Sequence, residues 1–290
     1  MRSASVAWRP INVQVAKNQS EGGSVSSIGS GGRSAVFSPL VSPLGGSVRG
    51  GRHVEWEGCF NVRDLGGVAV RGGGAIRTGA LIRSDNPERL TPEGWRALVD
   101  YGVRTIVDLR NEDERHGDLN PRPEMLTTVH VPLDDSADTA FWNEIWENEL
   151  DGSPLYYRVF IERKARLCAA AVAAIARARP GGVLVHCGLG RDRTGLIVML
   201  VLALTGVAPE DIAADYELSA ARLPPLFRAL GMADQTEEIR RILARKGTTA
   251  RDALLDALDG LDVEKHLRAA GLTDGDVAAL RARLIGLPDS

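Results

Sequence analysis

The residues most able to do chemistry lie together in one ten-residue segment, residues 186–195, which reads HCGLGRDRTG. The hydrophobic run VLVH ends at His186, and an apolar stretch from Thr194 to Thr205 follows the segment. The pattern therefore predicts a Gly-rich turn between a buried strand and the N-terminus of a buried helix. Backbone N–H groups and the helix dipole both favour an anion at such a turn, which predicts a cradle for phosphate or another tetrahedral oxyanion.

Two residues would turn this cradle into a catalytic site. Cys187 stands at the end of the strand, where the N–H groups that hold an anion would also stabilise a thiolate. Arg193 follows six positions later, and its planar guanidinium can hold two phosphate oxygens at once. Gly188, Gly190 and Gly195 let the backbone approach a ligand closely. A nucleophilic sulfur and a bidentate clamp beside one anion predict phosphoryl transfer to sulfur.

The spacing of a cysteine and an arginine occurs at one of the three cysteines. The residue six positions after Cys59 is Leu65, and the one six positions after Cys168 is Ala174, so Cys187 stands apart. The alternative is a buried, inert cysteine in an ordinary strand-to-helix turn, which leaves the arginine and the glycines unexplained. The sequence holds no G-x-x-x-x-G-K-[ST] pattern, which excludes a nucleotide-hydrolysing P-loop.

The elements that must position this segment are predicted from hydrophobic periodicity and from helix caps. Short β-branched runs predict strands, and Ala-rich or amphipathic segments predict helices. Strands alternate with helices in the first half of the body and helices dominate the second half, which indicates an α/β fold. The expected strands are residues 104–110, 127–133 and 183–186, and the expected helices are residues 92–101 (capped by Thr91), 165–179, 194–205, 211–221, 236–246, 250–258 and 274–284 (with Thr273 and Asp276 at its start).

Composition and charge exclude several classes of protein. The 290 residues are 44% hydrophobic and 25% charged, as in an ordinary soluble globular chain. A net charge of −3 gives no electrostatic case for binding nucleic acid or an anionic membrane. Three cysteines do not make a disulfide framework, and the longest apolar run, residues 196–204, is too short to span a bilayer. We expect a cytoplasmic protein with no nucleic-acid partner and no stable membrane association; its oligomeric state is open.

The first 54 residues differ from the rest in composition. They hold 11 Ser and 9 Gly, with one acidic residue against six Arg or Lys. Such a segment cannot bury enough apolar surface to offset its ordering entropy, so residues 1–54 are predicted to be a disordered tail and residues 55–290 a single catalytic domain. A basic docking arm is the functional alternative for the tail.

The segment at residues 186–195 resembles the signature of the cysteine-dependent protein-tyrosine phosphatase superfamily, HCxxGxxR[ST], and in particular its bacterial branch, which carries HCxxGKDRTG. Further motifs follow in the order of that branch: NVRDLGG at residues 61–67, IRTGALIRSD at 76–85, VDLR at 107–110 and Asp215-Tyr216 after the apolar helix. The resemblance covers about residues 55–285. It implies a phosphatase-like α/β fold, with a central, mostly parallel sheet flanked by helices and a helical C-terminal half.

The resemblance also implies a mechanism. Cys187 would attack the phosphorus of a phosphomonoester to form a phosphocysteine, and Thr194 would ease the later departure of the sulfur. In this branch the aspartate just before the arginine serves as the general acid, here Asp192. Asp134 and Asp135 are the other candidates, because many relatives carry the acid on a separate loop. The phosphate would be held by the backbone and side chains of Gly188, Leu189, Gly190, Arg191 and Arg193.

Two interpretations are open for His186, and two for Arg63 and Asp64. His186 would brace the loop, or it is a satisfied histidine at a strand end. Arg63 and Asp64 would brace the loop through a salt bridge, or Asp64 and the glycines after it fix a turn.

Two positions depart from the branch. Arg191 stands where the branch carries a lysine that is tied to the extra phosphates of lipid or inositol substrates. The alternative function, a phosphoinositide or inositol-phosphate phosphatase, depends on whether the arginine does the same. Val62 replaces a phenylalanine, and we expect only a packing adjustment.

Residues 141–160 hold six of the chain's 14 aromatic residues. They would form either a lid that stacks on a phosphotyrosine ring or a helical hairpin packed on the core. Cys59 would be either a buried free thiol or a disulfide partner for an oxidised Cys187. No group of residues has metal-ligand spacing, so no metal and no cofactor are expected.

The sequence therefore predicts a phosphatase of phosphotyrosine in proteins, with phosphoserine and phosphothreonine as further substrates of a dual-specificity enzyme. A rhodanese-like sulfurtransferase also places a cysteine in a short anion-binding loop, but it needs no general acid. A module that binds phosphorylated residues without catalysis is the non-enzymatic alternative.

Overall fold

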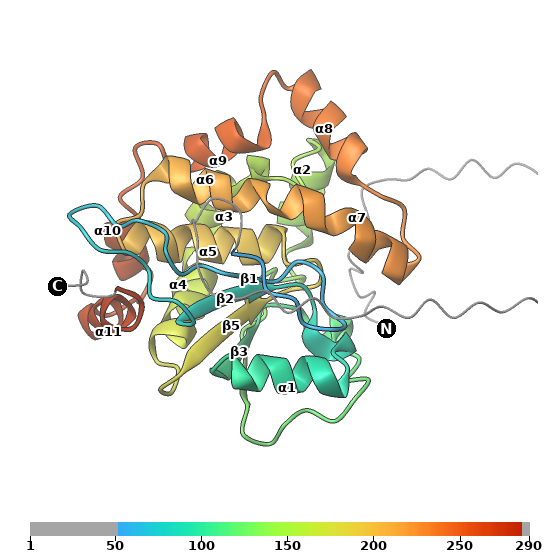
Figure 1. Ribbon diagram of the computed structural model, residues 1–290. Helices are drawn as coiled ribbons and strands as arrows, with labels where there is room; N and C mark the ends of the chain where they lie inside the picture. The colour runs from blue at the N-terminus through green and yellow to red at the C-terminus, as the bar shows by residue number, and fades with distance from the viewer. Residues whose placement is uncertain (1–51, 286–290) are drawn as a thin grey trace, which may run out of the picture.

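A five-stranded sheet forms the centre of the computed structural model, which describes residues 52–285 (Figure 1). β2, β5, β3 and β4 run parallel to one another, and β1 pairs antiparallel with β2 at one edge. The strands, in their order across the sheet, are β1 (Arg63–Asp64), β2 (Leu81–Ser84), β5 (Gly182–His186), β3 (Val103–Asp108) and β4 (Thr127–His130). The expected mostly parallel sheet is confirmed.

Helices cover both faces of the sheet (Figure 1). α1 (Pro92–Asp100) lies against one face, and the layer that contains α4 (Ala165–Ala176) and α5 (Asp192–Leu204) lies against the other. The remaining helices are α2 (Thr139–Glu147), α3 (Tyr157–Arg163), α6 (Pro209–Glu217), α7 (Ser219–Leu230), α8 (Thr236–Arg245), α9 (Ala250–Leu258), α10 (Val263–Ala269) and α11 (Asp274–Leu284), with short 3-10 turns η1 (Pro87–Arg89), η2 (Glu112–Glu114) and η3 (Pro154–Tyr156). The helical C-terminal half is also confirmed.

The two faces of the sheet carry separate hydrophobic layers, because successive side chains of a strand point to opposite sides. Leu81 and Val183 pack with the α4 and α5 layer. Their neighbours Ile82 and Leu184 pack with Trp95 of α1 on the other face. A strand buried on both faces must be apolar at consecutive positions, which is why VLVH reads as a continuous hydrophobic run.

Several elements differ from the sequence-based expectation. The strands expected at residues 104–110 and 127–133 end earlier, at Asp108 and His130, and the helix expected at 211–221 divides into α6 and α7 at Leu218. β1, β2, α2, α3, α7 and α10 were not predicted as separate elements. β1 and β2 have only two and four residues and bury charged side chains, so neither shows a hydrophobic period.

The body also includes residues before the predicted boundary at residue 55. Residues 52–54, placed in the tail by composition, pair with the body: Val54 N–H donates to the Val62 carbonyl at 3.2 Å, and Arg52 lies 3.3 Å from the Asp215 carboxylate. The predicted disorder of residues 1–51 falls outside the described residues and stays a prediction.

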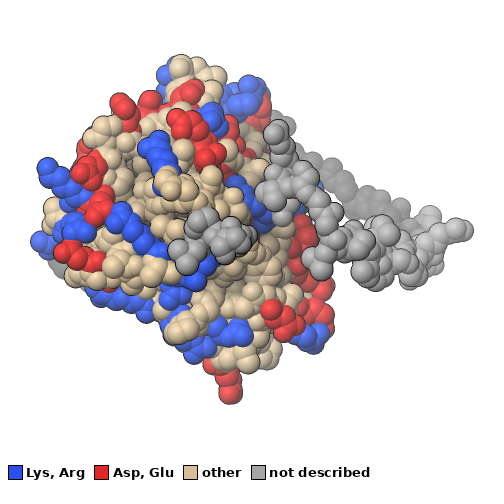
Figure 2. Space-filling model, turned by 60° about the vertical axis from the view of Figure 1, so that its left-hand side comes forward, with Lys and Arg blue, Asp and Glu red and all other residues tan. Residues whose placement is uncertain are grey.

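Two features of residues 52–285 concern possible partners: the length of the helices and the charge on the surface. No helix in this part of the chain is long and apolar enough to cross a membrane. Figure 2 shows basic and acidic side chains intermixed over the uncovered part of one face.

Candidate active site

Cys187 is the first residue after β5, the middle strand of the sheet, and it lines a cavity of about 240 Å³. Residues 187–191 connect β5 to α5, so the structure has the predicted strand, turn and helix N-terminus in the predicted order. These residues and the first two of α5, Asp192 and Arg193, are here called the Cys187 loop. The cysteine is 3% exposed. Ligands reach it only through the cavity, because β5 is buried on both sides.

Side chains of neighbouring segments hold the carbonyl groups of the Cys187 loop. Asn61 Nδ2 donates to the carbonyls of Leu189 and Gly190 at 3.1 and 3.3 Å, and Arg83 Nη2 donates to the Gly190 carbonyl at 2.8 Å. The N–H groups of residues 188–191 donate to no acceptor within residues 52–285. The loop therefore offers four free backbone donors beside the cysteine, as an anion cradle requires.

Glycine is required at two positions of this segment. Gly190 has a φ of +67°, and a Cβ there would lie 2.3 Å from the Ser84 carbonyl oxygen at the end of β2. A Cβ on Gly195 in the first turn of α5 would lie 2.5 Å from the Tyr157 hydroxyl. The loop passes so close to its neighbours that a side chain would displace it.

A buried ion cluster lies behind the loop. The Asp215 carboxylate of α6 is 3.0 Å from Arg63 Nε and 2.7 Å from Arg83 Nη1, with all three side chains at most 1% exposed. Burial acts to raise the pKa of Asp215, but the two guanidinium groups hold it well below its usual range. Since Arg83 also donates to the Gly190 carbonyl and Arg63 Nη1 donates to Asn61 at 2.8 Å, the cluster fixes the loop through both residues.

Of the two residues predicted to brace the loop through a salt bridge, Arg63 pairs with Asp215 behind the loop and Asp64 does not take part. Adjacent residues of a strand point to opposite faces, and β1 places Arg63 toward Asp215 while Asp64 faces the other way. The Asp64 carboxylate accepts hydrogen bonds from Gly66 N–H, Gly79 N–H and the Tyr101 hydroxyl at 2.6–2.8 Å. Asp64 therefore fixes a turn, which was the other interpretation, and it does not contact the Cys187 loop.

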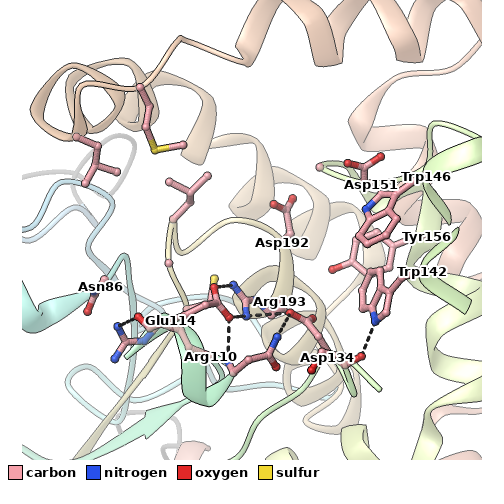
Figure 3. Close-up of a pocket in the computed structure, with 18 of the residues that line it drawn as sticks. Asn86, Arg110, Glu114, Asp134, Trp142, Trp146, Asp151, Tyr156, Asp192 and Arg193 are labelled. Atoms are coloured by element: carbon pink, nitrogen blue, oxygen red, sulfur yellow. Dashed lines mark hydrogen bonds and ion pairs between the residues drawn. The ribbon is translucent and has the colours of Figure 1, made fainter. Parts of the chain in front are cut away.

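Arg193 lies at the start of α5 and is oriented by carboxylates from two other segments. Its Nη1 and Nη2 are 2.5 and 2.6 Å from the two oxygens of Glu114, and Nη1 is 2.9 Å from the Asp134 carboxylate (Figure 3). Glu114 is itself held by the Asn111 N–H at 2.8 Å. Sequence reasoning missed this role of Glu114; its signal was the NEDE turn directly after the VDLR motif.

Asp134 lines the cavity, and burial has a strong effect on the pKa of its carboxyl group. It is 8% exposed, and burial raises its pKa to about 6 against the opposing charge of Arg193. Asn111 Nδ2 contacts its side chain at 3.3 Å, and the indole N–H of Trp142 donates to its backbone carbonyl at 2.7 Å.

The other two candidate acids are engaged elsewhere. Asp192 lines the cavity, but Arg191 holds both of its carboxylate oxygens, at 2.9 and 3.0 Å. Asp135 does not line the cavity, and its carboxylate lies 2.7 Å from Lys164. The side chain of Arg191, expected among the phosphate-binding groups, is 5% exposed and does not line the cavity either. The side chain folds back onto its neighbour Asp192, so phosphate binding by Arg191 rests on its backbone N–H and stays a prediction.

His186 precedes the Cys187 loop and Thr194 follows it, and both side chains are buried. Burial lowers the pKa of His186 to about 4, so the ring is neutral at neutral pH; Nδ1 lies 3.1 Å from the Cys187 carbonyl and Nε2 lies 3.5 Å from Asp108. The Thr194 hydroxyl is buried and has no hydrogen-bond partner within residues 52–285. A buried hydroxyl without a partner is costly, so it is available to a group that the reaction brings in.

The aromatic residues of 141–160 fall into two groups: some pack in the core and others line the cavity. Phe141, Tyr157 and Phe160 are buried in the core, as a packed helical hairpin requires. Trp142, Trp146 and Tyr156 line the cavity, and we call these three residues the aromatic wall (Figure 3). Figure 3 places this wall, with Asp151 beside it, across the cavity from Asn86.

Cys59 is a free, buried cysteine. It packs with Trp56 in the layer on the α1 face of the sheet, whereas Cys187 packs in the opposite layer. Burial raises the pKa of the Cys59 thiol well above its usual value, which makes it a weak nucleophile.

The chain is similar to known tyrosine phosphatases over most of its length. A model of the tyrosine phosphatase family matches residues 54–286. The chain is 29% identical over 266 residues to a protein of Cupriavidus necator provisionally named a tyrosine-protein phosphatase, with 84% of this chain and 92% of that protein covered. It is 28% identical over 279 residues to the triple specificity protein phosphatase PtpB of Mycobacterium tuberculosis, covering 80% of this chain and 99% of the relative. A tyrosine-protein phosphatase of Nostoc commune is 31% identical over 159 residues, half of each chain.

The family match spans the sheet, the Cys187 loop and Glu114, which lie at the cavity, and also Asp215 behind the loop. The chain belongs to the tyrosine phosphatase family, a family of phosphoric monoester hydrolases.

Proposed function

We propose that this protein removes phosphate from phosphotyrosine in proteins through a phosphocysteine on Cys187. The observation that carries the proposal is that Cys187 and Arg193 line one cavity and are joined by a loop with four free N–H groups. The aromatic wall favours an aryl ester, because the phosphotyrosine ring can stack on indole and phenol faces. Phosphoserine and phosphothreonine would be weaker substrates, since they lack that ring.

The proposed reaction has two displacements on phosphorus. In the first, the Cys187 thiolate forms a bond to phosphorus while the bond to the phenolic oxygen breaks, and a carboxylic acid gives its proton to that oxygen. In the second, water attacks phosphorus, the sulfur leaves, and the carboxylate takes a proton from the water. Arg193 and the free N–H groups would hold the phosphate oxygens in both steps, and the unpartnered Thr194 hydroxyl would donate to the departing sulfur.

For the acid we propose Asp134 in place of Asp192. An acid must be protonated when substrate binds, and burial raises the pKa of Asp134 to about 6. Asp192 would first have to leave its two contacts with Arg191. Asp134 also lies 2.9 Å from the guanidinium that would hold the phosphate, and this proximity supports its role as the acid.

The first experiment is hydrolysis of p-nitrophenyl phosphate and of a phosphotyrosine peptide by the full chain and by Cys187→Ser. We expect the variant to lose at least about a thousandfold in kcat, because the hydroxyl is a far weaker nucleophile than the thiolate. Cys168→Ala, in α4 and away from the cavity, is the control and should retain turnover. Wild-type protein should also react with iodoacetamide at Cys187, and vanadate should protect it. Near wild-type turnover by Cys187→Ser would refute the assignment.

The same measurements separate the alternatives. A sulfurtransferase would turn over thiosulfate and leave p-nitrophenyl phosphate intact. A binding module would bind phosphotyrosine with no turnover by wild type. Activity on phosphoinositides receives no support from Arg191, because its side chain is withdrawn from the cavity. A cytoplasmic location is part of the proposal and is tested by cell fractionation.

A further inference from the structure

Three arginines line the cavity, and they differ in how fully their donors are used. Arg193 is paired with Glu114 and Asp134. Arg110 is 2% exposed and lies 2.8 Å from both Asp108 and Glu88. Arg89 has a single ion pair, at 3.3 Å with Asp85, and its buried Nε has no partner within residues 52–285.

Arg89 also differs in its position. Its side chain is 22% exposed, so it can meet a ligand that extends out of the cavity toward solvent. It ends η1, the turn that begins at Asn86, and Asn86 N–H donates to the Gly188 carbonyl of the Cys187 loop at 3.1 Å. Arg89 is therefore held on the Asn86 side of the loop, and Figure 3 places Asn86 across the cavity from the aromatic wall.

We propose that Arg89 forms an anion subsite at the mouth of the cavity and binds a carboxylate side chain next to phosphotyrosine in the substrate. This inference deepens the proposed function and rests on it. An arginine with unused donors forms charge-assisted hydrogen bonds to a carboxylate, and partial exposure keeps the cost of removing its water low.

A peptide carboxylate fits the mouth better than an inositol ring with several phosphates. The opposite side of the cavity carries the carboxyl group of Asp151 beside the aromatic wall (Figure 3). A polyphosphorylated ring carries charge in several directions and would bring a phosphate against that group. A peptide places one acidic side chain on one side of the ring, and the aromatic wall remains in contact with the phenyl ring.

The test compares two phosphotyrosine peptides that differ only in carrying glutamate or glutamine on the residues beside phosphotyrosine. The quantity measured is the ratio of kcat/KM for the two peptides within each protein, so a general loss of activity cancels. At low salt we expect wild type to favour the glutamate peptide by about three- to tenfold, as for a partly exposed charge pair. Arg89→Gln should bring the ratio close to one, Arg89→Lys should keep part of it, and added salt should reduce it in wild type.

Arg96→Gln in α1 is the matched control, because Arg96 is 66% exposed and does not line the cavity. The ratio of kcat/KM for the two peptides should be the same in this variant as in wild type. A ratio near one in wild type, or an unchanged ratio in Arg89→Gln, overturns the subsite. A larger loss on a bisphosphorylated inositol than on the glutamate peptide in Arg89→Gln would also overturn it, since the subsite would then take a phosphate. Failure of wild type to hydrolyse either peptide would instead refute the proposed function.

Discussion

The two sides of the cavity are built in different ways. The Cys187 loop is one continuous stretch of sequence, and the groups behind it are buried: Asn61 and the cluster of Asp215 with Arg63 and Arg83. The aromatic wall comes from α2 and η3, and ion pairs with exposed partners flank it, such as Arg163 with Glu144 (41% and 54% exposed).

The difference matches what each side has to do. Atoms that stabilise a transition state must be held to a fraction of an ångström, and buried ion pairs with full hydrogen bonding give that precision. A surface that accepts the ring and flanks of varied substrates gains nothing from such rigidity. We therefore expect substitutions behind the loop to affect stability and rate most, and substitutions behind the wall to affect them least.

The largest effect is expected from Asp215→Asn. It leaves Arg63 and Arg83 buried without a countercharge, which should lower the free energy of unfolding by about 3–5 kcal/mol. Urea denaturation at neutral pH measures the loss. Glu217→Gln, on the same helix but in an exposed pair with Arg251, is the control and should change little. Equal losses in the two variants would show that burial of the ion pair does not decide the size of the effect.

The pH dependence of stability has a definite sign at this cluster. The pKa of Asp215 is lower in the folded chain than in the unfolded one. Its contribution to stability is therefore present above the unfolded value of 3.8 and is lost as the pH falls through the lower folded value. Asp215→Asn should accordingly lose its disadvantage relative to wild type in strong acid.

Asp134→Asn should have the next largest effect. The kcat/KM for a phosphotyrosine peptide should fall by about a hundredfold at pH 5.5, the lower end of the usual contribution of a general acid. Loss on p-nitrophenyl phosphate should be much smaller, because its leaving group needs less help from a proton. In wild type, kcat/KM should decline as the pH rises through about 6, where Asp134 loses its proton, and that decline should be absent in the variant.

Asp135→Asn is the matched control for Asp134, since it is the next residue and its carboxylate binds Lys164 outside the cavity. Asp192→Asn tests the rival acid. If Asp192→Asn and not Asp134→Asn removes the decline near pH 6, the acid is Asp192.

A smaller effect is expected from Trp142→Phe. The change keeps an aromatic ring on the wall but removes the N–H that holds the Asp134 carbonyl at 2.7 Å. We expect kcat for phosphotyrosine peptides to fall by about three- to tenfold, the value of one hydrogen bond, with KM nearly unchanged. Trp146→Phe is the control, because Trp146 lines the same cavity without a contact to Asp134. Equal losses in kcat would mean that the ring, and not the N–H, matters.

The smallest effect is expected from Glu144→Gln on α2. It breaks the exposed pair with Arg163, and such pairs contribute less than about 1 kcal/mol to stability. Thermal denaturation and peptide turnover should both stay close to wild type. A loss as large as that of Asp215→Asn would show that the wall is as rigidly supported as the loop.

The sequence by itself determined the parts of this protein that depend on neighbouring residues. The Cys187 loop, the strand before it and the apolar helix after it are local features, and so are the Thr91 cap and the capping box of Thr273 with Asp276. Each follows from backbone geometry or hydrophobic burial within a few residues, which a single sequence displays directly.

Only the tertiary structure decided which charged groups meet at the site. Glu114 and Arg193 are 79 positions apart, and Arg63 and Asp215 are 152 apart. The order of strands brings these pairs together, and no local pattern specifies that order. The same reason explains why two side chains lie away from the cavity: Asp64 is next to Arg63 in sequence but on the opposite face of β1, and the side chain of Arg191 folds onto Asp192. Adjacency along a chain fixes which residues share an element, whereas packing decides which side chains share a cavity.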